Sequence, residues 1–374
     1  MAHLGIVGAG LAGAGAAYAL RDTDHDATIL EKSRGVGGRA ATRRRDGCRY
    51  DHGANYVKLP DERTGDLIRD LGDDGLVDIA EPVWTFGADG EIAPGDGDDE
   101  HKYTWEAGIT QFAKRLLAET DAEVRKTTRA ESIVRDGGGA RDGTADGDTG
   151  PGGDRGGAWT VTDADGDDHG PFDALVLTPP APQTADLLAA TEWPDDGGAL
   201  ADLRAAVEAT EFRTVRTLAL HYPFELDVPW YGLVDVEKTH EIGWLSREEC
   251  KRGHVPDGEG LLIVQLSPEW STAHYDDSLE AAAAEAATLA ADLVGDDRLA
   301  DPDWADDQGW RYALPNEGLV GDGGPDAAAG AVAAAREAGL YLAGDWVAGR
   351  GRAAAALWNG IDAGESIAER LSGR

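Results

Sequence analysis

Three glycines near the amino end have the spacing of a dinucleotide-binding turn. Gly8, Gly10 and Gly13 form the pattern G-x-G-x-x-G between a short apolar run and an alanine-rich stretch. In a strand–turn–helix unit, the first glycine permits the tight turn, the second lets the backbone approach a pyrophosphate, and the third lets helix and strand pack closely. The helix that begins with Leu11 and Ala12 then presents free N–H groups to the phosphates. This spacing predicts a dinucleotide site rather than a glycine-rich turn without a ligand.

A carboxylate and a second glycine cluster follow where a dinucleotide needs them. Glu31 lies 21 positions after Gly10 (31 − 10), close to the spacing of the acid that binds ribose hydroxyls. Lys32 comes next, and then the sequence GVGGR, in which Gly38 lets the backbone pass close to a ligand. Arg39 offers charge-assisted contacts to pyrophosphate oxygens, with pairing to a surface acid as its alternative role. Simple NAD dehydrogenases do not need this second element, so it favours FAD.

The carboxyl end offers a second contact for the same dinucleotide. The apolar run at 339–346 contains Gly344 and Asp345, and a helix is expected from near Ala353. Asp345 would accept a hydrogen bond from a ribityl or pyrophosphate-side hydroxyl, with a helix N-cap as the alternative. The helix N-terminus would favour negative charge on the pyrimidine edge of a reduced flavin.

Aromatic residues in the middle of the chain are candidate walls of a substrate site. Trp310 and Tyr312 alternate on one expected strand and therefore share a face, while Trp244 and His221 lie on other expected strands. Hydride transfer to a flavin requires the protein to hold a C–H donor and exclude competing reactions. These four are the candidate catalytic residues, with a core or interface role as the alternative for each. We expect His52 to be structural rather than a base.

The elements that must position these residues follow from apolar patterning. Strands are expected within residues 3–7, 27–31, 122–136, 157–166, 172–180, 214–224, 240–248, 260–270, 309–315 and 339–346. Helices are expected at 11–22, 67–78, 107–119, 278–295 and 353–371. Residues 137–157 contain almost no apolar side chains and are expected to form a mobile loop.

Composition limits the partners of the protein. The 374 residues carry a formal net charge of −37, which repels nucleic acid and anionic membranes and suggests adaptation to high salt. Cys48 and Cys250 cannot form a disulfide framework, so a reducing cytoplasm is expected. No long uncharged apolar run indicates a membrane span. With no Cys-x-x-Cys and no histidine-rich spacing, no metal site is expected.

Two stretches resemble a known enzyme family. GIVGAGLAGAGAAYAL and ILEKSRGVGGR look like the amino terminus of the flavin amine oxidase superfamily. ATRRRDGCRYDHGANYV is similar to the renalase-like branch, whose members carry Asp-(His or Leu)-Gly-Ala-Gln-Tyr, and the blocks FDALVLTPPAPQTADLL and GWRYALP match that branch too. The resemblance assigns four further residues to the cofactor, namely Gly53, Ala54, Asn55 and Tyr56. Asn55 stands where the branch has glutamine.

The resemblance implies an α/β protein of two domains. A Rossmann-like FAD-binding domain of the amine-oxidase type would comprise residues 1–75, 106–190 and 325–374. An inserted α+β mixed-sheet substrate domain would comprise residues 76–105 and 191–324. Neither cysteine lies in the carboxyl-terminal flavin block, so the FAD is expected to be non-covalent.

The same resemblance implies an oxidase that acts on a small molecule. The substrate would be a reduced nicotinamide dinucleotide or an isomer of it, with hydride passing to flavin N5 and electrons then to dioxygen, forming hydrogen peroxide. Alternatives are amine oxidation, desaturation of a hydrophobic substrate, and a non-catalytic module that escorts prenylated proteins. Amine oxidases use a lysine near N5, but the lysines of the middle region, Lys238 and Lys251, lie in no motif. The oligomeric state stays open.

Overall fold

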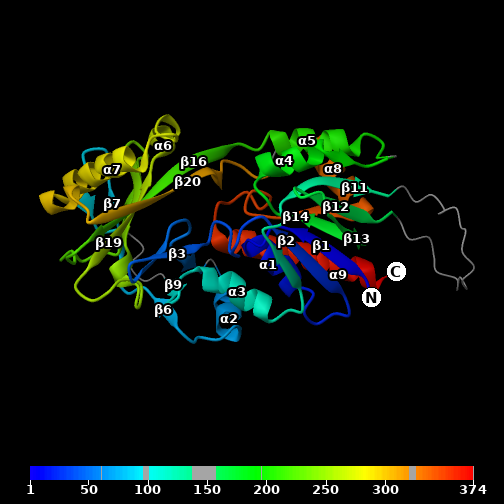
Figure 1. Ribbon diagram of the computed structural model, residues 1–374, viewed down its shortest axis with the longest axis horizontal. Coiled ribbons are helices and arrows are strands. Elements are labelled where there is room, and N and C mark those ends of the chain that lie inside the picture. Colours follow the sequence, from blue (N-terminus) through cyan, green and yellow to red (C-terminus); the bar gives the residue numbers. More distant parts are fainter. Residues whose placement is uncertain (60, 96–100, 137–156, 195, 320–325, 374) are drawn as a thin grey trace, which may run out of the picture. The chain divides into compact units, whose positions relative to one another are not determined.

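The computed structural model describes residues 1–59, 61–95, 101–136, 157–194, 196–319 and 326–373 (Figure 1). Nearly all of the loop predicted at 137–157 lies outside these residues. Contacts divide the chain into two units, which are described separately. Unit 1 comprises Met1–Gly38, Ala113–Glu211 and Pro315–Arg374, and unit 2 comprises Arg39–Phe112 and Phe212–Leu314.

Unit 1 is built on a five-stranded parallel sheet in the order β10-β2-β1-β14-β21. Its strands are β1 (His3–Val7), β2 (Asp26–Glu31), β10 (Glu123–Lys126), β14 (Ala174–Leu177) and β21 (Leu340–Leu342). Because the first and last strands of the chain are both neighbours of β14, the two ends of the chain share one sheet.

Two helices from opposite ends of the chain pack closely in unit 1. They are α1 (Leu11–Tyr18) and α9 (Ala353–Ser372), drawn in blue and red in Figure 1. A Cβ added at Gly360 would lie 2.0 Å from the Ala12 carbonyl oxygen, and one at Gly364 would lie 2.5 Å from that of Ala16. These glycines therefore allow the two backbones to approach.

A second sheet and further helices complete unit 1. The sheet has the order β13-β12-β11-β15. Its strands are β11 (Ala130–Arg135), β12 (Trp159–Asp163), β13 (Asp168–Phe172) and β15 (Thr191–Glu192). The helices are α4 (Ala181–Ala189), α5 (Ala199–Glu208) and α8 (Asp326–Ala338), and α3 (Thr110–Ala118) spans the boundary between the units. Helices α4, α5 and α8 were not expected from the sequence.

Unit 2 is built on a seven-stranded mixed sheet in the order β20-β16-β19-β18-β17-β7-β8, mostly antiparallel with a parallel β17–β7 pair. Its strands are β7 (Val83–Phe86), β8 (Ile92–Ala93), β16 (Phe212–Tyr222), β17 (Gly232–Asp235), β18 (Ile242–Arg247), β19 (Gly260–Leu266) and β20 (Trp304–Pro315). Apolar side chains of this sheet form one core with helix α7 (Leu279–Val294).

Shorter elements lie before and between the strands of this sheet along the chain. They are the hairpin β3 (Thr42–Arg45) and β4 (Cys48–Asp51), the sheet of β5 (Val57–Lys58), β6 (Leu76–Asp78) and β9 (Lys102–Trp105), the helices α2 (Glu62–Asp70) and α6 (Pro268–Ala273), and the 3-10 turns η1 (Glu248–Cys250) and η2 (Asp297–Ala300). None of the described helices combines the length and the apolar character that crossing a membrane requires.

One expected helix and the expected domain boundaries differ from the structure. The helix expected at 67–78 is wrong: α2 ends at Asp70, and β6 occupies the last three positions, paired with β9. This pairing is long-range, so local apolar spacing does not reveal it. Residues 39–75 and 106–112 fall in unit 2, and residues 191–211 and 315–324 fall in unit 1. The first of these segments contacts the seven-stranded sheet, and α5 packs against α4 and α8.

Candidate functional site

The glycine turn of unit 1 depends on two of its glycines for steric reasons. Gly8 has a φ of +100° and its N–H donates to the Leu30 carbonyl oxygen at 2.8 Å, which closes the turn against β2. A Cβ at Gly13 would lie 2.0 Å from the Gly8 carbonyl oxygen. The fold itself therefore requires glycine at both positions.

Gly10 is different, because nothing in the chain requires a glycine there. Its φ of −73° and ψ of −175° are ordinary extended values, and an added Cβ would meet only the Gly38 Cα, at 4.0 Å. Gly10 also forms a parallel bridge with Gly37, so the second glycine cluster lies beside the first. The space in front of Gly10 is thus left for a group from outside the chain, which fits the close approach of a pyrophosphate.

The start of α1 suits an anion. No side chain caps its N-terminus, and its first turn contains no acidic residue. Leu11 and Ala12, the first two helical residues, are buried. The positive end of the helix dipole is therefore not compensated by the helix itself, and its free N–H groups would satisfy phosphate oxygens.

Glu31 is buried at the carboxyl end of β2 and is held by backbone. Its Oε2 accepts from Ala9 N–H and its Oε1 from Ser33 N–H, both at 2.7 Å. A carboxylate has about four acceptor sites, so two ribose hydroxyls would still find lone pairs. Lys32 is exposed and lies 3.4 Å from Gln183 through Nζ and Oε1.

Gly344 and Gly8 follow parallel strands separated by one strand, so both lie at the same carboxyl edge of the sheet. Gly344 N–H donates to Asn359 Oδ1 of α9 at 2.9 Å. Asp345 is buried, and its Oδ1 accepts from Trp346 N–H at 3.0 Å. Helix α9 begins at Ala353, as expected, and no side chain caps it. The residues predicted at both ends thus meet at one edge, and their cofactor contacts stay predictions.

In unit 2 the segment 52–56 reaches three strands of the large sheet. The His52 carbonyl oxygen accepts from Trp310 Nε1 of β20 at 2.9 Å, and that of Gly53 accepts from Gln265 Nε2 of β19 at 2.7 Å. The Tyr56 ring lies 6.2 Å from the Trp244 ring of β18. Side chains of β20, β19 and β18 therefore position this segment.

Local contacts fix the rest of the segment. Ala54 N–H donates to the Arg39 carbonyl oxygen at 2.9 Å, and Asn55 Nδ2 donates to the Asp51 carbonyl oxygen at 2.6 Å. The Arg39 side chain donates from Nη1 to the Ala313 carbonyl oxygen at 2.8 Å. A guanidinium carries five N–H donors, and the contact of Arg39 with a phosphate stays a prediction.

His52 fits the structural role expected for it. Its ring stacks on Trp310 with centroids 5.3 Å apart and planes within 11°. Burial, with Arg43 nearby, lowers the pKa of His52 to about 4. The ring is therefore neutral near pH 7.

The four candidate catalytic residues do not form one group. Trp310 and Trp244 both contact the segment 52–56, and Tyr312 packs near Phe212 with ring centroids 6.0 Å apart. His221 instead stacks on Trp304 at 4.9 Å. Trp304 and Trp310 are six positions apart on β20, which is about 20 Å at the rise of a strand. His221 thus lies away from the tryptophan pair, because long antiparallel strands carry residues to opposite ends of a sheet.

A buried ionic network was missed by the sequence analysis. Lys251 Nζ lies 3.1 Å from Asp51 Oδ2 and 2.5 Å from Glu248 Oε1, and none of these side chains is exposed. Glu248 Oε2 lies 2.7 Å from His254 Nδ1, and His254 Nε2 lies 2.9 Å from the Trp105 carbonyl oxygen. Both neighbours of His254 are acceptors, so the geometry fits a protonated ring and a network without net charge.

The network shifts the pKa values of Asp51 and Lys251 away from their usual values. Burial would raise the pKa of Asp51, but Lys251, His254 and hydrogen bonds to the carboxylate outweigh it and lower that pKa. Burial would lower the pKa of Lys251, but Asp51 and Glu248 outweigh it and raise that pKa. Lys251 is therefore a locked cation rather than a lysine free to face a substrate. The one feature of the sequence that could have pointed to this network is that Asp51 directly precedes the segment 52–56.

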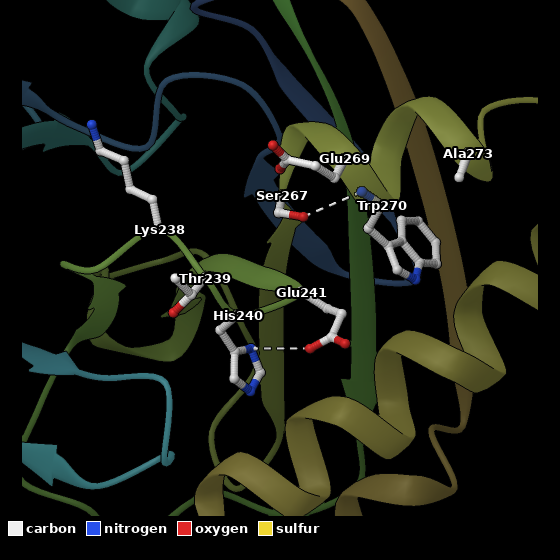
Figure 2. A pocket seen from close by; sticks show the side chains of 8 residues that line it. All are labelled: Lys238, Thr239, His240, Glu241, Ser267, Glu269, Trp270 and Ala273. Atoms are coloured by element: carbon white, nitrogen blue, oxygen red, sulfur yellow. Dashed lines mark hydrogen bonds and ion pairs between the residues drawn. The ribbon is translucent and has the colours of Figure 1, made fainter.

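A surface pocket of about 520 Å³ lies in unit 2, and Figure 2 shows the side chains that line it. Its lining comes from the turn before β18 and from α6 with its N-cap residue Ser267. The lining residues are Lys238, Thr239, His240, Glu241, Ser267, Glu269, Trp270 and Ala273. Predicted site residues are not among them, so this pocket adds nothing to the assignment of the site.

Comparisons with known proteins agree with the geometry of unit 1. Residues 6–71 match the family described as NAD(P)-binding Rossmann-like domain. The chain is 38% identical over 58 residues to a 4,4'-diapophytoene desaturase (4,4'-diaponeurosporene-forming) of Staphylococcus aureus (strain Newman), a match that covers 16% of this chain and 12% of that protein. The chain thus spans about an eighth of the length of the curated relative it matches.

Solved structures match over the whole chain. Cyclohexylamine oxidase from Brevibacterium oxydans IH-35A has a TM-score of 0.70 at 15% identity, with 99% of each chain covered. A reduced UDP-galactopyranose mutase has a TM-score of 0.72 at 12% identity, with 100% of this chain and 96% of the other covered. The predicted α/β class and amine-oxidase-type fold are confirmed. A desaturase, an oxidase and a mutase name three different reactions, so the fold does not fix the substrate.

Proposed function

We propose that this chain, which has the fold of the FAD-dependent amine oxidases, is an FAD-dependent oxidoreductase that binds its cofactor non-covalently. The observation that carries the proposal is the open space at Gly10, beside Gly37 and the uncapped start of α1. Neither the backbone angles of Gly10 nor its neighbours require a glycine at this position. A pyrophosphate is the chemical group that this combination of glycine backbone and helix dipole would accept.

The geometry of unit 1 supports the assignment of the residues that would hold FAD. The backbone N–H groups at the start of α1 would bind the pyrophosphate, and Glu31 would accept from the ribose hydroxyls. At the other end of the chain, Asp345 would accept from a cofactor hydroxyl, and α9 would direct its positive end at the flavin. The resemblance further assigns Gly38, Arg39 and the segment 53–56 to the cofactor.

Bound FAD would supply a two-electron acceptor for hydride at N5 and would return the electrons to dioxygen, with hydrogen peroxide as the product. The protein's own contribution is positional. The hydrogen bonds from Trp310 and Gln265 hold the segment 52–56, and the Trp310 and Trp244 rings offer flat apolar walls. The neutral His52 and the locked Lys251 supply no base, which suits a hydride donor that needs little proton transfer.

A reduced nicotinamide dinucleotide or an isomer of it is the proposed substrate, on the resemblance of residues 51–56 to the renalase-like branch. Aromatic walls suit stacking of a flat dihydropyridine ring. Oxidation of an amine is the second candidate, favoured by the fold shared with cyclohexylamine oxidase. Anaerobic mixing of the FAD-loaded protein with NADH, its isomers and a panel of amines tests both, with flavin bleaching as the readout. Bleaching by amines alone would refute the proposed substrate.

Flavin content tests the proposal at a coarser level. A yellow purified protein with flavin absorption bands, released on denaturation, would support non-covalent FAD. A colourless protein that cannot be reconstituted with FAD would instead support the escort-type binding module. Peroxide formed in stoichiometric amounts under air would support dioxygen as acceptor, and reoxidation that needs another acceptor would contradict it.

A further inference from the structure

Two clusters of possible metal ligands lie within the described part of unit 2. One comprises Asp51, Glu248 and His254, and the other Cys48, His221 and Glu259. In the first cluster Lys251 already supplies the positive charge, and its carboxylates are satisfied by hydrogen bonds. Around the second cluster, no described lysine or arginine pairs with its members. The second cluster therefore offers metal-ligating side chains whose negative charge no described lysine or arginine neutralises.

Three segments that are far apart in sequence form the second cluster. Cys48 begins β4, His221 lies near the end of β16, and Glu259 directly precedes β19. One donor atom from each lies within 4.8 Å of the other two, and His221 Nε2 is already 2.9 Å from Glu259 Oε2. This wide sequence spacing matches no metal-binding motif, which explains why no metal site was expected.

Burial and stacking fix the orientation of the His221 ring. It is only 5% exposed and stacks on Trp304 with planes within 4°, so its orientation is fixed. Its Nδ1 is buried without a hydrogen-bond partner and lies 3.6 Å from Asp303 Oδ2. A carboxylate beside the second ring nitrogen is the usual companion of a histidine that ligates a metal.

We propose that Cys48, His221 and Glu259 form a binding site for Zn²⁺ or a similar thiolate-accepting divalent transition metal. A thiolate, an imidazole and a carboxylate are all zinc ligands, and three protein ligands leave a fourth position for water. Zinc–ligand bonds of 2.0–2.3 Å place tetrahedral donors about 3.5 Å apart, so the donors must close slightly on binding. Glu259, whose side chain is 37% exposed, has the freedom to do so and marks the route from solvent.

The charge around the cluster favours a cation. The negative charges of Glu259 and Asp46 lie near Cys48. Those charges attract a divalent ion, which in turn favours the thiolate over the thiol. The metal would tie the hairpin β3–β4 to strands β16 and β19, and it would thereby support the segment that follows Asp51. This role is independent of the proposed substrate.

The experiment uses the purified full-length protein with any bound cofactor, after dialysis against EDTA and removal of the chelator. Isothermal titration with Zn²⁺ measures affinity and stoichiometry, and zinc X-ray absorption identifies the ligands, a readout that a flavin does not obscure. We expect one tight equivalent with one sulfur at about 2.3 Å. No tight equivalent, or a zinc shell without sulfur, would overturn the proposal.

Paired variants locate the site. Cys48→Ser should remove the sulfur from the zinc shell and weaken binding by about tenfold or more. Cys250→Ser, at the other cysteine, should leave both unchanged. Glu259→Gln should weaken binding, whereas Asp257→Asn, at an exposed acid two positions away, should not. If Cys48→Ser fails to fold by circular dichroism, the Glu259 and Asp257 pair and the wild-type zinc shell still decide. Equal affinities in that pair would contradict the site.

Discussion

Lys251 Nζ lies 3.1 Å from Asp51 Oδ2, and both side chains are fully buried. Asp51 directly precedes the segment 52–56 in the sequence. The network around this pair joins the end of β4 to η1 and, through His254, to the Trp105 carbonyl oxygen. Removing one charge from such a network leaves its partner buried and uncompensated, which costs far more than losing a surface ion pair. The first two predictions follow from this relationship.

Replacing Lys251 with methionine should lower the free energy of unfolding by about 3–5 kcal/mol, because Asp51 and Glu248 would keep buried negative charge without a cation. Urea unfolding at pH 7 measures the change. Lys126→Met, at an exposed lysine of β10, is the matched control and should stay within about 0.5 kcal/mol of wild type. Equal small effects of the two variants would show that the network contributes little.

The contribution of the network should depend on pH at both extremes. Asp51 has a pKa below its usual 3.8, so its contribution is present above pH 3.8 and is lost as the pH falls through the lowered value. Lys251 has a pKa above its usual 10.5, so its contribution is present below pH 10.5 and is lost as the pH rises through the raised value. The stability gap between wild type and Asp51→Asn should therefore narrow in acid. A gap independent of pH would contradict this.

Two glycine substitutions should separate folding from cofactor binding. Gly10→Ala places a methyl group in open space, so thermal stability without FAD should be retained while FAD affinity falls by at least about tenfold. Gly13→Ala forces a Cβ to within 2.0 Å of the Gly8 carbonyl oxygen and should cost about 3 kcal/mol or more. Melting curves and flavin titration are the measurements. Unchanged FAD affinity in Gly10→Ala would refute the pyrophosphate assignment.

Trp310→Phe should separate a structural role from a substrate role. Phenylalanine keeps the stacking on His52 but leaves the His52 carbonyl oxygen without its donor, which should cost about 1 kcal/mol. If Trp310 is also a substrate wall, the rate of flavin bleaching should fall while FAD affinity is retained. Tyr312→Phe, which changes only a hydroxyl on the same strand, serves as the control. Loss of stability with an unchanged bleaching rate would restrict Trp310 to the structural role.

High salt should stabilise the protein, because a net charge of −37 makes the folded state repel itself when screening is weak. The melting temperature should rise between about 0.1 and about 2 M KCl, since the screening length falls from about 10 Å at 0.1 M to about 3 Å at 1 M. NaCl should act like KCl if screening is the cause. A melting temperature indifferent to salt would defeat the idea of adaptation to a saline environment.

The sequence alone was sufficient for the dinucleotide turn and the elements next to it. G-x-G-x-x-G after a buried strand, with Glu31 at the end of the next strand, is a local pattern, because each residue is placed by a turn or a strand end next to it in sequence. Apolar runs and helix propensity located β1, β2, α7 and α9 to within a few residues for the same reason. The helix expected at 67–78 was wrong because β6 is defined by its partner β9 rather than by its own spacing.

Only the tertiary structure decided which distant residues meet. The strand order β1-β14-β21 brings Gly344 to the same sheet edge as Gly8, which no local pattern fixes. Long-range sheet pairing likewise separates His221 from Trp310, encloses Lys251 between Asp51 and Glu248, and gathers Cys48, His221 and Glu259. Spacing in sequence encodes turns and helical faces, whereas strand pairing and burial depend on the whole chain. The dinucleotide-binding fold was therefore readable from the sequence, and the buried charge and ligand clusters were not.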